Sequence, residues 1–404
     1  MSSAKLGCLG PRLVWLWLLW LLVIWGYQAA VTTRYQIQRP DRVLFWTAAR
    51  TDGSTRHPYL ESPFMAAQTG WDSEFYLSIA LQGYDDPQIR TAPALPTAAA
   101  PLNRPLSLNY AFFPVYPLLI RGVALPLTAV GLPPLAAATL AGALISACGT
   151  LVALLALSDW MQSQGWSQDD QLRAAAYLLS FPTGFFLAQV YTEGLFLALS
   201  FGCLALAERR QWGGAALLAT LATLTRAVGL FLLVPLVWAW WNGGRQLRSG
   251  LVLVLPLLAH LIWRFSLWGE AFQIVQRQFF GCGLLNLSTA LPAWGNALLA
   301  LGQGTATTVH SAVELAAVGL GLGACLATLK RWPGLSIYGL LIILTSTTCG
   351  TTWSLSRYLL TVPSVFLLLA CCGRSPVFDR IWSLISILLL AMLAALFSFD
   401  FWAG

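Results

Sequence analysis

Leu13 to Val31, which reads LVWLWLLWLLVIWGYQAAV, is an apolar run of about 19 residues. A helix of this length reaches across the hydrocarbon core of a bilayer, roughly 30 Å, because each residue adds about 1.5 Å. Lys5 and Arg12 precede the run, as in a signal peptide, but no small-residue cleavage signal follows it. The run therefore predicts a retained membrane-spanning helix.

The composition extends this prediction to the whole chain. Of the 404 residues, 57% are hydrophobic and 10% are charged, whereas charged residues make up about a quarter of a soluble domain. Several of the 19 tryptophans stand at the ends of apolar runs, as in the aromatic belts of membrane proteins. No basic run of five or more residues accompanies the net charge of +7, so nucleic-acid binding is not indicated. The sequence predicts an all-α polytopic membrane protein.

Windows of about 20 apolar residues predict about eleven spans within a single transmembrane domain, residues 1–404. Residues 112–130 are also apolar but contain three prolines and Arg121, so we interpret them as an interfacial or re-entrant helix. With that segment excluded and the amino terminus cytoplasmic, every short cytoplasmic loop is basic, which satisfies the positive-inside rule. The predicted spans are 13–31, 134–158, 172–188, 193–208, 212–226, 228–241, 249–267, 309–329, 334–350, 357–373 and 380–399.

Cysteine and histidine usage does not support a metal site. The eight cysteines lie mostly within apolar runs and form no CxxC pair, so we interpret them as small buried hydrophobic side chains. His57, His260 and His310 are far apart in the sequence. We therefore predict neither a metal nor another cofactor.

Residues 32–111 form a long polar loop, which the topology places outside the cytoplasm. About 80 residues are too many for a structureless connector, so part of the loop is expected to fold on the membrane surface. Asp72 to Gln82 is predicted as an amphipathic juxtamembrane helix, because apolar residues recur at helical spacing and Gly83 follows as a C-terminal cap. Thr91 to Pro105 is rich in alanine and proline and is predicted as a flexible flap.

Asp72 carries the main functional hypothesis. An Asp in the first turn of a short helix is a preferred N-cap that accepts backbone N–H bonds. Beside Trp71 and Phe75, above the bundle of spans, the same carboxylate can instead act as a general base, and both roles can hold together. Glu74 points to another side of the helix, and Asp85-Asp86 is interpreted as a solvated turn.

Five arginines are predicted to lie near the outer membrane boundary, whereas the basic residues that satisfy the positive-inside rule lie in the cytoplasmic loops. Burying them near hydrocarbon is costly, so each is expected to pair with a protein acid or with a ligand phosphate. We favour Arg226 and Arg357, with Arg264 third, as phosphate ligands, because a guanidinium group meets phosphate oxygens in pairs. The group comprises Arg121, Arg226, Arg264, Arg277 and Arg357, with Glu193, Glu270 and Glu314 as neighbouring acids.

Five short motifs follow one another along the chain. They are Trp71-Asp72-Ser73 with Phe75-Tyr76, Ile79-Ala80 and Gly83-Tyr84; Phe112-Phe113-Pro114-Val115-Tyr116-Pro117-Leu118; Phe181-Pro182 with Tyr191-Thr192-Glu193; Leu224-Thr225-Arg226-Ala227-Val228-Gly229; and Ser356-Arg357-Tyr358-Leu359-Leu360 before Pro363. Together, and nearly from end to end, they resemble the PIG-V-like mannosyltransferases. That family comprises GPI mannosyltransferase II and its prokaryotic relatives, within the GT-C class of membrane glycosyltransferases.

The resemblance implies an enzyme that takes a hexose, with mannose expected, from a polyprenyl-phosphate carrier on the extracytoplasmic side. Such an enzyme transfers the sugar to an acceptor hydroxyl with inversion at the anomeric carbon. Membrane lipids are expected to surround it. Asp72 matches the acidic residue expected to act as base. Glu74 and the loosely matching Gln276, Gln278 and Trp294 depart from the family pattern and leave the acceptor unidentified. The residues expected to bind substrate are Trp71, Phe113, Pro114, Tyr191, Glu193, Arg226, Arg264, Arg357 and Tyr358.

Two other functions fit the same features. A transporter or flippase would move a lipid-linked sugar without chemistry, although the repeats and midplane charges typical of transporters are not visible. A GT-C enzyme that glycosylates proteins or lipid A-like acceptors would differ only in its acceptor. The compact length and the use of arginine rather than lysine favour a bacterial plasma membrane over the endoplasmic reticulum membrane.

Overall fold

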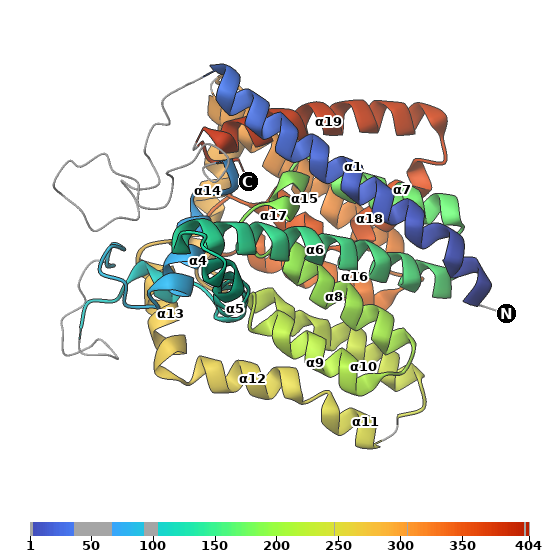
Figure 1. Cartoon of the computed structure of the whole chain (residues 1–404). Coiled ribbons are helices and arrows are strands. Elements are labelled where there is room, and N and C mark those ends of the chain that lie inside the picture. The colour runs from blue at the N-terminus through green and yellow to red at the C-terminus, as the bar shows by residue number, and fades with distance from the viewer. Residues whose placement is uncertain are drawn as a thin grey trace.

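The computed structural model describes residues 3–35, 67–92, 104–245, 247–304, 306–399 and 401–403. Within these ranges every regular element is a helix, and the one pairing of extended backbone is a bridge between Thr91 and Ser107. The prediction of an all-helical fold is confirmed (Figure 1). The α-helices are α1 (Ser3–Tyr35), α4 (Asp72–Leu81), α5 (Val115–Ala129), α6 (Pro134–Ser163), α7 (Gln168–Leu179), α8 (Glu193–Glu208), α9 (Trp212–Thr223), α10 (Leu233–Asn242), α11 (Leu247–Val252), α12 (Leu255–Arg264), α13 (Leu267–Gln278), α14 (Leu287–Ala300), α15 (Ala306–Thr328), α16 (Pro333–Thr347), α17 (Leu355–Tyr358), α18 (Pro363–Cys372) and α19 (Pro376–Ser398). The 3₁₀ helices are η2 (Leu108–Ala111), η3 (Gly184–Ala188), η4 (Ala227–Leu232) and η5 (Leu359–Thr361).

Five helical segments in the described part of the chain are long and apolar enough to cross a membrane, or six if one bent pair is a single span. Their outer faces carry exposed apolar side chains, such as Trp15 on α1 and Leu384 on α19, as expected of surfaces that meet lipid. The count of about eleven spans stays a prediction. The five segments are Leu9–Tyr35, Pro134–Ser163, Leu247–Arg264, Thr308–Thr328 and Pro376–Ser398.

Among the interrupted spans, the two predicted at 172–188 and 357–373 are broken next to the candidate site. The span predicted at 172–188 breaks after Leu179 and resumes as η3, because Pro182 cannot donate a helical hydrogen bond and disfavours helix before it. The span predicted at 357–373 bends by 84° between its two halves, where Pro363 begins α18. Such breaks are tolerated in membrane proteins where other protein surrounds the backbone. Both breaks lie next to the charged residues of the candidate site.

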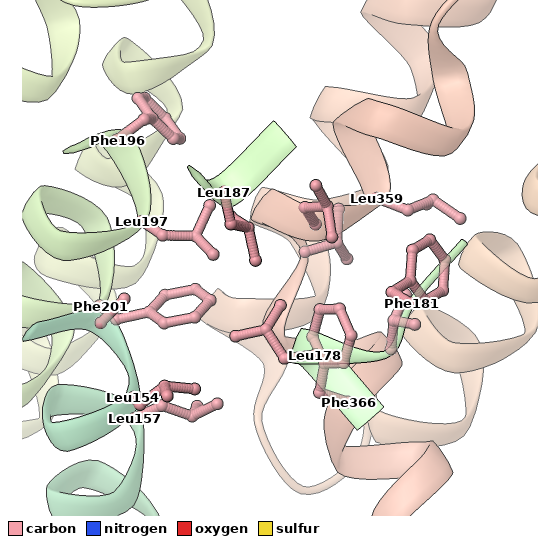
Figure 2. Close-up of a cluster of buried hydrophobic side chains, with 14 of the residues drawn as sticks. Leu154, Leu157, Leu178, Phe181, Leu187, Phe196, Leu197, Phe201, Leu359 and Phe366 are labelled. Carbon is pink, nitrogen blue, oxygen red and sulfur yellow. The ribbon is translucent and has the colours of Figure 1, made fainter. Parts of the chain in front are cut away.

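Small residues let α6 and α8 pack against each other at close range. A Cβ atom on Gly194 would lie 2.0 Å from the Ser146 carbonyl oxygen, and one on Gly149 would lie 2.7 Å from Gly194. Glycine is required at both positions because any side chain would separate the two backbones. Leucine and phenylalanine side chains of α6, α7, α8 and α18 form a buried hydrophobic core, which includes Leu154, Leu178, Phe201 and Phe366 (Figure 2).

The helix predicted in the polar loop is present as α4, and Gly83 follows it with φ of +91°, as expected of a C-terminal cap. It is not amphipathic toward solvent, because Ser73 to Ala80 are all buried. Polar residues of the loop form hydrogen bonds to Ser78 of α4. Asn109 Nδ2 donates to Ser78 Oγ (2.8 Å), and Ser78 Oγ donates to Asp86 Oδ2 (2.7 Å). The prediction that Asp86 is solvated is therefore wrong, since this carboxylate is used to satisfy buried hydroxyl groups.

The rest of the polar loop is described in part. Within 112–130, α5 is a helix of 15 residues whose Arg121 Nε donates to the Ala80 carbonyl of α4 (2.6 Å). Its interfacial or re-entrant position stays a prediction. Residues 36–66, which include His57, and residues 93–103 of the predicted flap lie outside the described residues.

Candidate active site

Asp72 is the first residue of α4, and Tyr191 holds the backbone on either side of it. The Tyr191 hydroxyl accepts a hydrogen bond from the Asp72 N–H (3.2 Å) and donates one to the Gly70 carbonyl (2.9 Å). Trp71 is the N-cap residue, with φ of +52°, a left-handed value that bulky residues rarely adopt. No side chain caps the helix, so the N-cap prediction for Asp72 is wrong. Its carboxylate instead faces an arginine.

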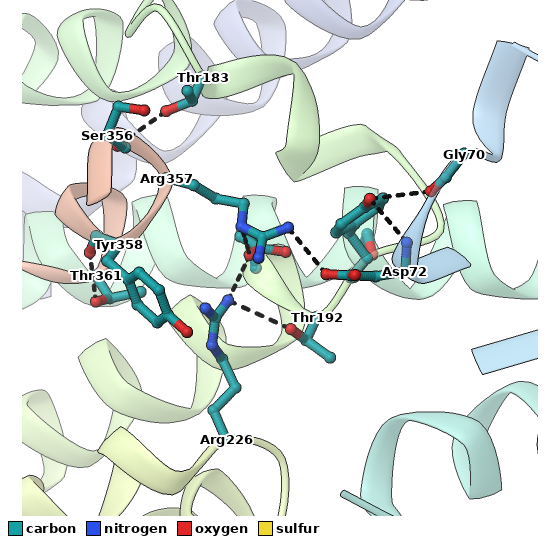
Figure 3. Close-up of polar contacts among 12 residues, drawn as sticks. Gly70, Asp72, Thr183, Thr192, Arg226, Ser356, Arg357, Tyr358 and Thr361 are labelled. Carbon is teal, nitrogen blue, oxygen red and sulfur yellow. Dashed lines mark hydrogen bonds and ion pairs between the residues drawn. The ribbon is translucent and has the colours of Figure 1, made fainter. Parts of the chain in front are cut away.

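Four charged side chains from four separate parts of the chain form one network (Figure 3). Arg357 Nη1 contacts Asp72 Oδ2 at 3.2 Å, and Arg357 Nε contacts Glu193 Oε1 at 3.2 Å. Arg226 Nη1 contacts the same oxygen of Glu193 and also donates to Thr192 Oγ1 at 3.4 Å. Glu193 is therefore the centre of the network, and Asp72 is its end.

Burial differs across the network. The side chain of Glu193 is 1% exposed and those of Arg357 and Arg226 are 8% and 10% exposed, whereas that of Asp72 is 18% exposed. Two carboxylates and two guanidinium groups cancel in formal charge, which is the arrangement that makes buried ions tolerable. Asp72 is the member most accessible to an incoming molecule.

Aromatic rings hold both guanidinium groups. Arg226 Cζ lies 4.6 Å from the centre of the Tyr358 ring, and Arg357 Cζ lies 5.3 Å from the rings of Phe186 and Tyr191. Cation–π attraction of this kind is favourable where water is excluded. Tyr191 and Tyr358, both singled out in the sequence, therefore act on the charges through their hydroxyl group or their ring face.

Glu314 fixes the segment that carries Arg357. Its carboxylate accepts hydrogen bonds from the Ser356 N–H (3.0 Å) and the Ser356 hydroxyl (2.9 Å), while Thr183 Oγ1 donates to the Ser356 carbonyl (3.0 Å). The sequence-based expectation paired Glu314 with an outer arginine. The carboxylate supports Arg357 through its neighbour Ser356, because Ser356 brings two donors to the buried carboxylate.

The environment of Asp72 makes it a stronger base than an ordinary aspartate. Burial raises its pKa above the usual 3.8, the charge of Arg357 opposes that rise, and the charge of Glu193 adds to it. A carboxylate with a raised pKa and partial access to solvent is suited to take a proton from a bound hydroxyl group.

Three of the sequence-predicted substrate residues lie apart from the charged network. Arg264 is exposed and lines a separate pocket of about 420 Å³ together with Glu270 and Arg277. Phe113 packs on Trp263 and Phe272, with ring centres 5.5 and 5.0 Å away, and Pro114 is the N-cap of α5. The structure brings together Asp72, Tyr191, Glu193, Arg226, Arg357 and Tyr358, but it does not bring Arg264 to them.

An aromatic wall beside the network was not foreseen. Trp402 packs against Trp71, with ring centres 5.2 Å apart, and against Trp353 at 6.0 Å, and its ring lies 5.6 Å from Arg357 Cζ. Aromatic rings in such a wall offer flat apolar faces and, in tryptophan, an N–H donor. No local pattern in the sequence links these residues, which come from different ends of the chain.

Among the described residues, no group of three or more histidine, cysteine, aspartate or glutamate side chains could hold a metal ion. The prediction that no metal or other cofactor takes part stays a prediction.

Comparisons with known proteins complete this description. No protein-family model and no curated protein matches the sequence. Among solved structures, the oligosaccharyltransferase of the archaeon Archaeoglobus fulgidus in its apo form is similar, with a TM-score of 0.45 and 12% identity. The archaeal oligosaccharyltransferase AglB from Archaeoglobus fulgidus, in complex with an inhibitory peptide and a dolichol-phosphate, gives a TM-score of 0.45 and 14% identity. Each alignment covers 95% of this chain but 56% of the other, so the chain spans little more than half the length of those proteins. Similarity at this level does not assign the chain to a family.

Proposed function

We propose that this chain is a membrane glycosyltransferase of the GT-C class, similar to the PIG-V-like enzymes. It moves a hexose, with mannose favoured, from a polyprenyl-phosphate donor to an acceptor hydroxyl on the extracytoplasmic side of a bacterial plasma membrane, with inversion. The observation that carries the proposal is the pairing of a partly exposed carboxylate, Asp72, with the buried Arg357. The order of sequence motifs that includes both residues supports it.

The chemistry needs few groups. A sugar bonded to a lipid phosphate already has a good leaving group, so the demands are to deprotonate the attacking hydroxyl and to stabilise the departing phosphate. Asp72 takes the hydroxyl proton, and the bond between the anomeric carbon and the phosphate oxygen breaks as the hydroxyl oxygen attacks from the opposite face. Arg357 and Arg226 stabilise the negative charge that stays on the phosphate.

Arg357 links the two roles. In the structure it contacts Asp72 through Nη1 and Glu193 through Nε, and a guanidinium group has five N–H donors in total. A donor phosphate that binds Arg357 competes with Asp72 for the same charge. Donor binding therefore weakens the interaction that lowers the pKa of Asp72 and makes the carboxylate a better base. Glu193 keeps both arginines in place during this exchange.

The test is to incubate purified protein with polyprenyl-phosphate mannose or polyprenyl-phosphate glucose and an extract of membrane lipids, and to measure release of free polyprenyl phosphate. We expect release from one donor that depends on added acceptor and that is reduced about a hundredfold or more in Asp72→Asn. Movement of the intact donor between leaflets of a vesicle, without release of the carrier from either donor, would support the flippase alternative and refute transfer.

A further inference from the structure

Cys282 and Cys349 are far apart in the sequence but adjacent in the fold. Cys282 lies between α13 and α14, and Cys349 lies between α16 and α17. Two backbone hydrogen bonds join these segments, from the Gly283 N–H to the Cys349 carbonyl (2.8 Å) and from the Asn286 N–H to the Thr348 carbonyl (2.8 Å). Because Cys282 is the residue before Gly283, these bonds bring the backbones of the two cysteines close together.

The glycines beside the two thiols bring the backbones into close contact. A Cβ atom on Gly350, which has φ of +123°, would lie 2.4 Å from the Gly281 carbonyl oxygen. The space between the two segments is therefore too small for a side chain at a point one residue away from each cysteine. Disulfides need such an approach, with Cα atoms roughly 4.4–6.8 Å apart.

Neither thiol fits the sequence-based interpretation as a buried hydrophobic side chain. Both cysteines are partly exposed, whereas Cys203 and Cys325 are fully buried in the core. A metal is a poor alternative occupant, because a structural zinc site needs four ligands and no cluster of three such residues exists in the described part of the chain. Two accessible cysteines on segments that are hydrogen-bonded to each other are an arrangement from which a disulfide can form.

The pair also joins the two halves of the candidate site. Phe280, two residues before Cys282, packs on Phe75 of α4, with ring centres 6.3 Å apart. Cys349 belongs to the segment that leads into α17, which carries Arg357. A covalent bond here would fasten the support of the Asp72 helix to the segment of its arginine partner.

We propose that Cys282 and Cys349 form a disulfide bond in the mature protein. In the predicted topology Cys282 lies in an extracytoplasmic loop and Cys349 lies at the outer end of the span 334–350, and disulfides persist in extracytoplasmic compartments. One thiolate attacks the disulfide of an oxidised dithiol carrier, and the second thiolate displaces the carrier from the mixed disulfide. The two cysteines lose two electrons and two protons, and the carrier is reduced to a dithiol. The proposal depends on the topology and not on the transferred sugar.

The experiment is thiol-blocked peptide mapping of the full-length protein, expressed in a host that oxidises extracytoplasmic thiols. Membranes are treated with N-ethylmaleimide before solubilisation, and the digest is analysed by mass spectrometry without reductant. We expect peptides containing Cys282 and Cys349 to be joined and two hydrogen atoms lighter than the separate pair. In Cys282→Ser, Cys349 should react with N-ethylmaleimide before reduction. Cys148→Ser is the matched control and should keep the joined peptides.

Recovery of both wild-type cysteines as maleimide adducts before reduction would overturn the proposal. A second measurement guards against poor expression of the variants. Reductant should lower the unfolding temperature of the wild type and of Cys148→Ser, because it removes a cross-link that restricts the unfolded chain. It should leave the double variant Cys282→Ser/Cys349→Ser unchanged. An equal decrease in the double variant would also contradict the disulfide.

Discussion

The starts of α4 and α7 lie toward opposite ends of the helical bundle (Figure 1). Each holds a carboxylate beside arginine side chains, but the two carboxylates are held in opposite ways. In the first turn of α7, Asp170 accepts two hydrogen bonds from Arg374, at 3.0 and 2.8 Å, and one from Arg173 at 2.8 Å. At the start of α4, Asp72 has one arginine contact among the described residues, with Arg357 at 3.2 Å. The same types of side chain make a structural link at one end and a candidate reactive group at the other.

The pKa shifts follow this difference. Hydrogen bonds from Arg374 lower the pKa of Asp170 to about 2, whereas burial raises the pKa of Asp72 above its usual value. A carboxylate with several charged donors stays ionised and cannot take up a proton near neutral pH. A buried carboxylate with one charged donor keeps its basicity. Burial that raises the pKa at one site, and several charged donors that lower it at the other, distinguish the two sites.

The largest expected effect separates these two aspartates. Asp72→Asn should reduce turnover by about a hundredfold or more, the usual size of a general-base contribution, with donor binding and folding retained. Asp170→Asn is the matched control, because it removes a carboxylate that also contacts arginine but lies away from the candidate site, and it should leave turnover nearly unchanged. Release of polyprenyl phosphate measures both. Near-normal turnover in Asp72→Asn would end the assignment of the base.

A second substitution compares the arginines. Arg357→Ala should raise the donor concentration needed for half-maximal rate by about tenfold or more, because a buried guanidinium group is lost from the phosphate. Arg357→Lys should restore part of the loss, since it keeps the charge but not the paired donors. Initial rates over a range of donor concentrations give the result. If Arg357→Ala only reduces expression, with unchanged kinetics, the arginine is a structural partner.

The two carboxylates should also respond differently to pH. Turnover should increase as pH rises through the raised pKa of Asp72 and then level off, because only the ionised form accepts a proton. The pKa of Asp170 is depressed in the fold, so its contribution to stability is present above pH 3.8 and is lost as pH falls toward about 2. A pH–rate profile and unfolding measurements at acidic pH test the two parts. If the residual activity of Asp72→Asn still increases with pH over the same range, the titrating group is not Asp72.

The smallest effect is expected at the far end of the bundle. Arg374→Ala should lower stability by less than about 1 kcal/mol, because the Arg374 side chain is 61% exposed and its interaction with Asp170 is screened by water. The donor requirement should not change. Thermal unfolding and donor titration of the purified variant provide the check, and a clear kinetic defect would mean that the two ends are coupled.

Part of the candidate site was predictable because its signals are local. Charged residues in apolar surroundings are rare, so Glu193, Arg226 and Arg357 could be singled out from composition alone. The start of α4 and its glycine cap were predictable from spacing over a few residues. Arg264 carried the same signal as Arg226, and nothing in the sequence distinguished an arginine that turns outward from one that joins the network.

Other features had no local signal. Asp72 looked like a helix cap, because the sequence does not show that Arg357 occupies its carboxylate or that Tyr191 holds its N–H. The contact of Trp402 with Trp71 and the proximity of Cys282 to Cys349 depend on segments that meet after folding.

Apolar length and helical period were sufficient to predict a helical membrane protein, because both depend on residues that are neighbours in the chain. The charged network depends on packing: the close approach of α6 and α8 and the breaks before α8 and α18 place Glu193 between two arginines and leave Asp72 at the edge. Electrostatic attraction depends on the distance between charges in space, and burial depends on the atoms packed around them. For residues that are far apart in the sequence, both are set only when the helices pack.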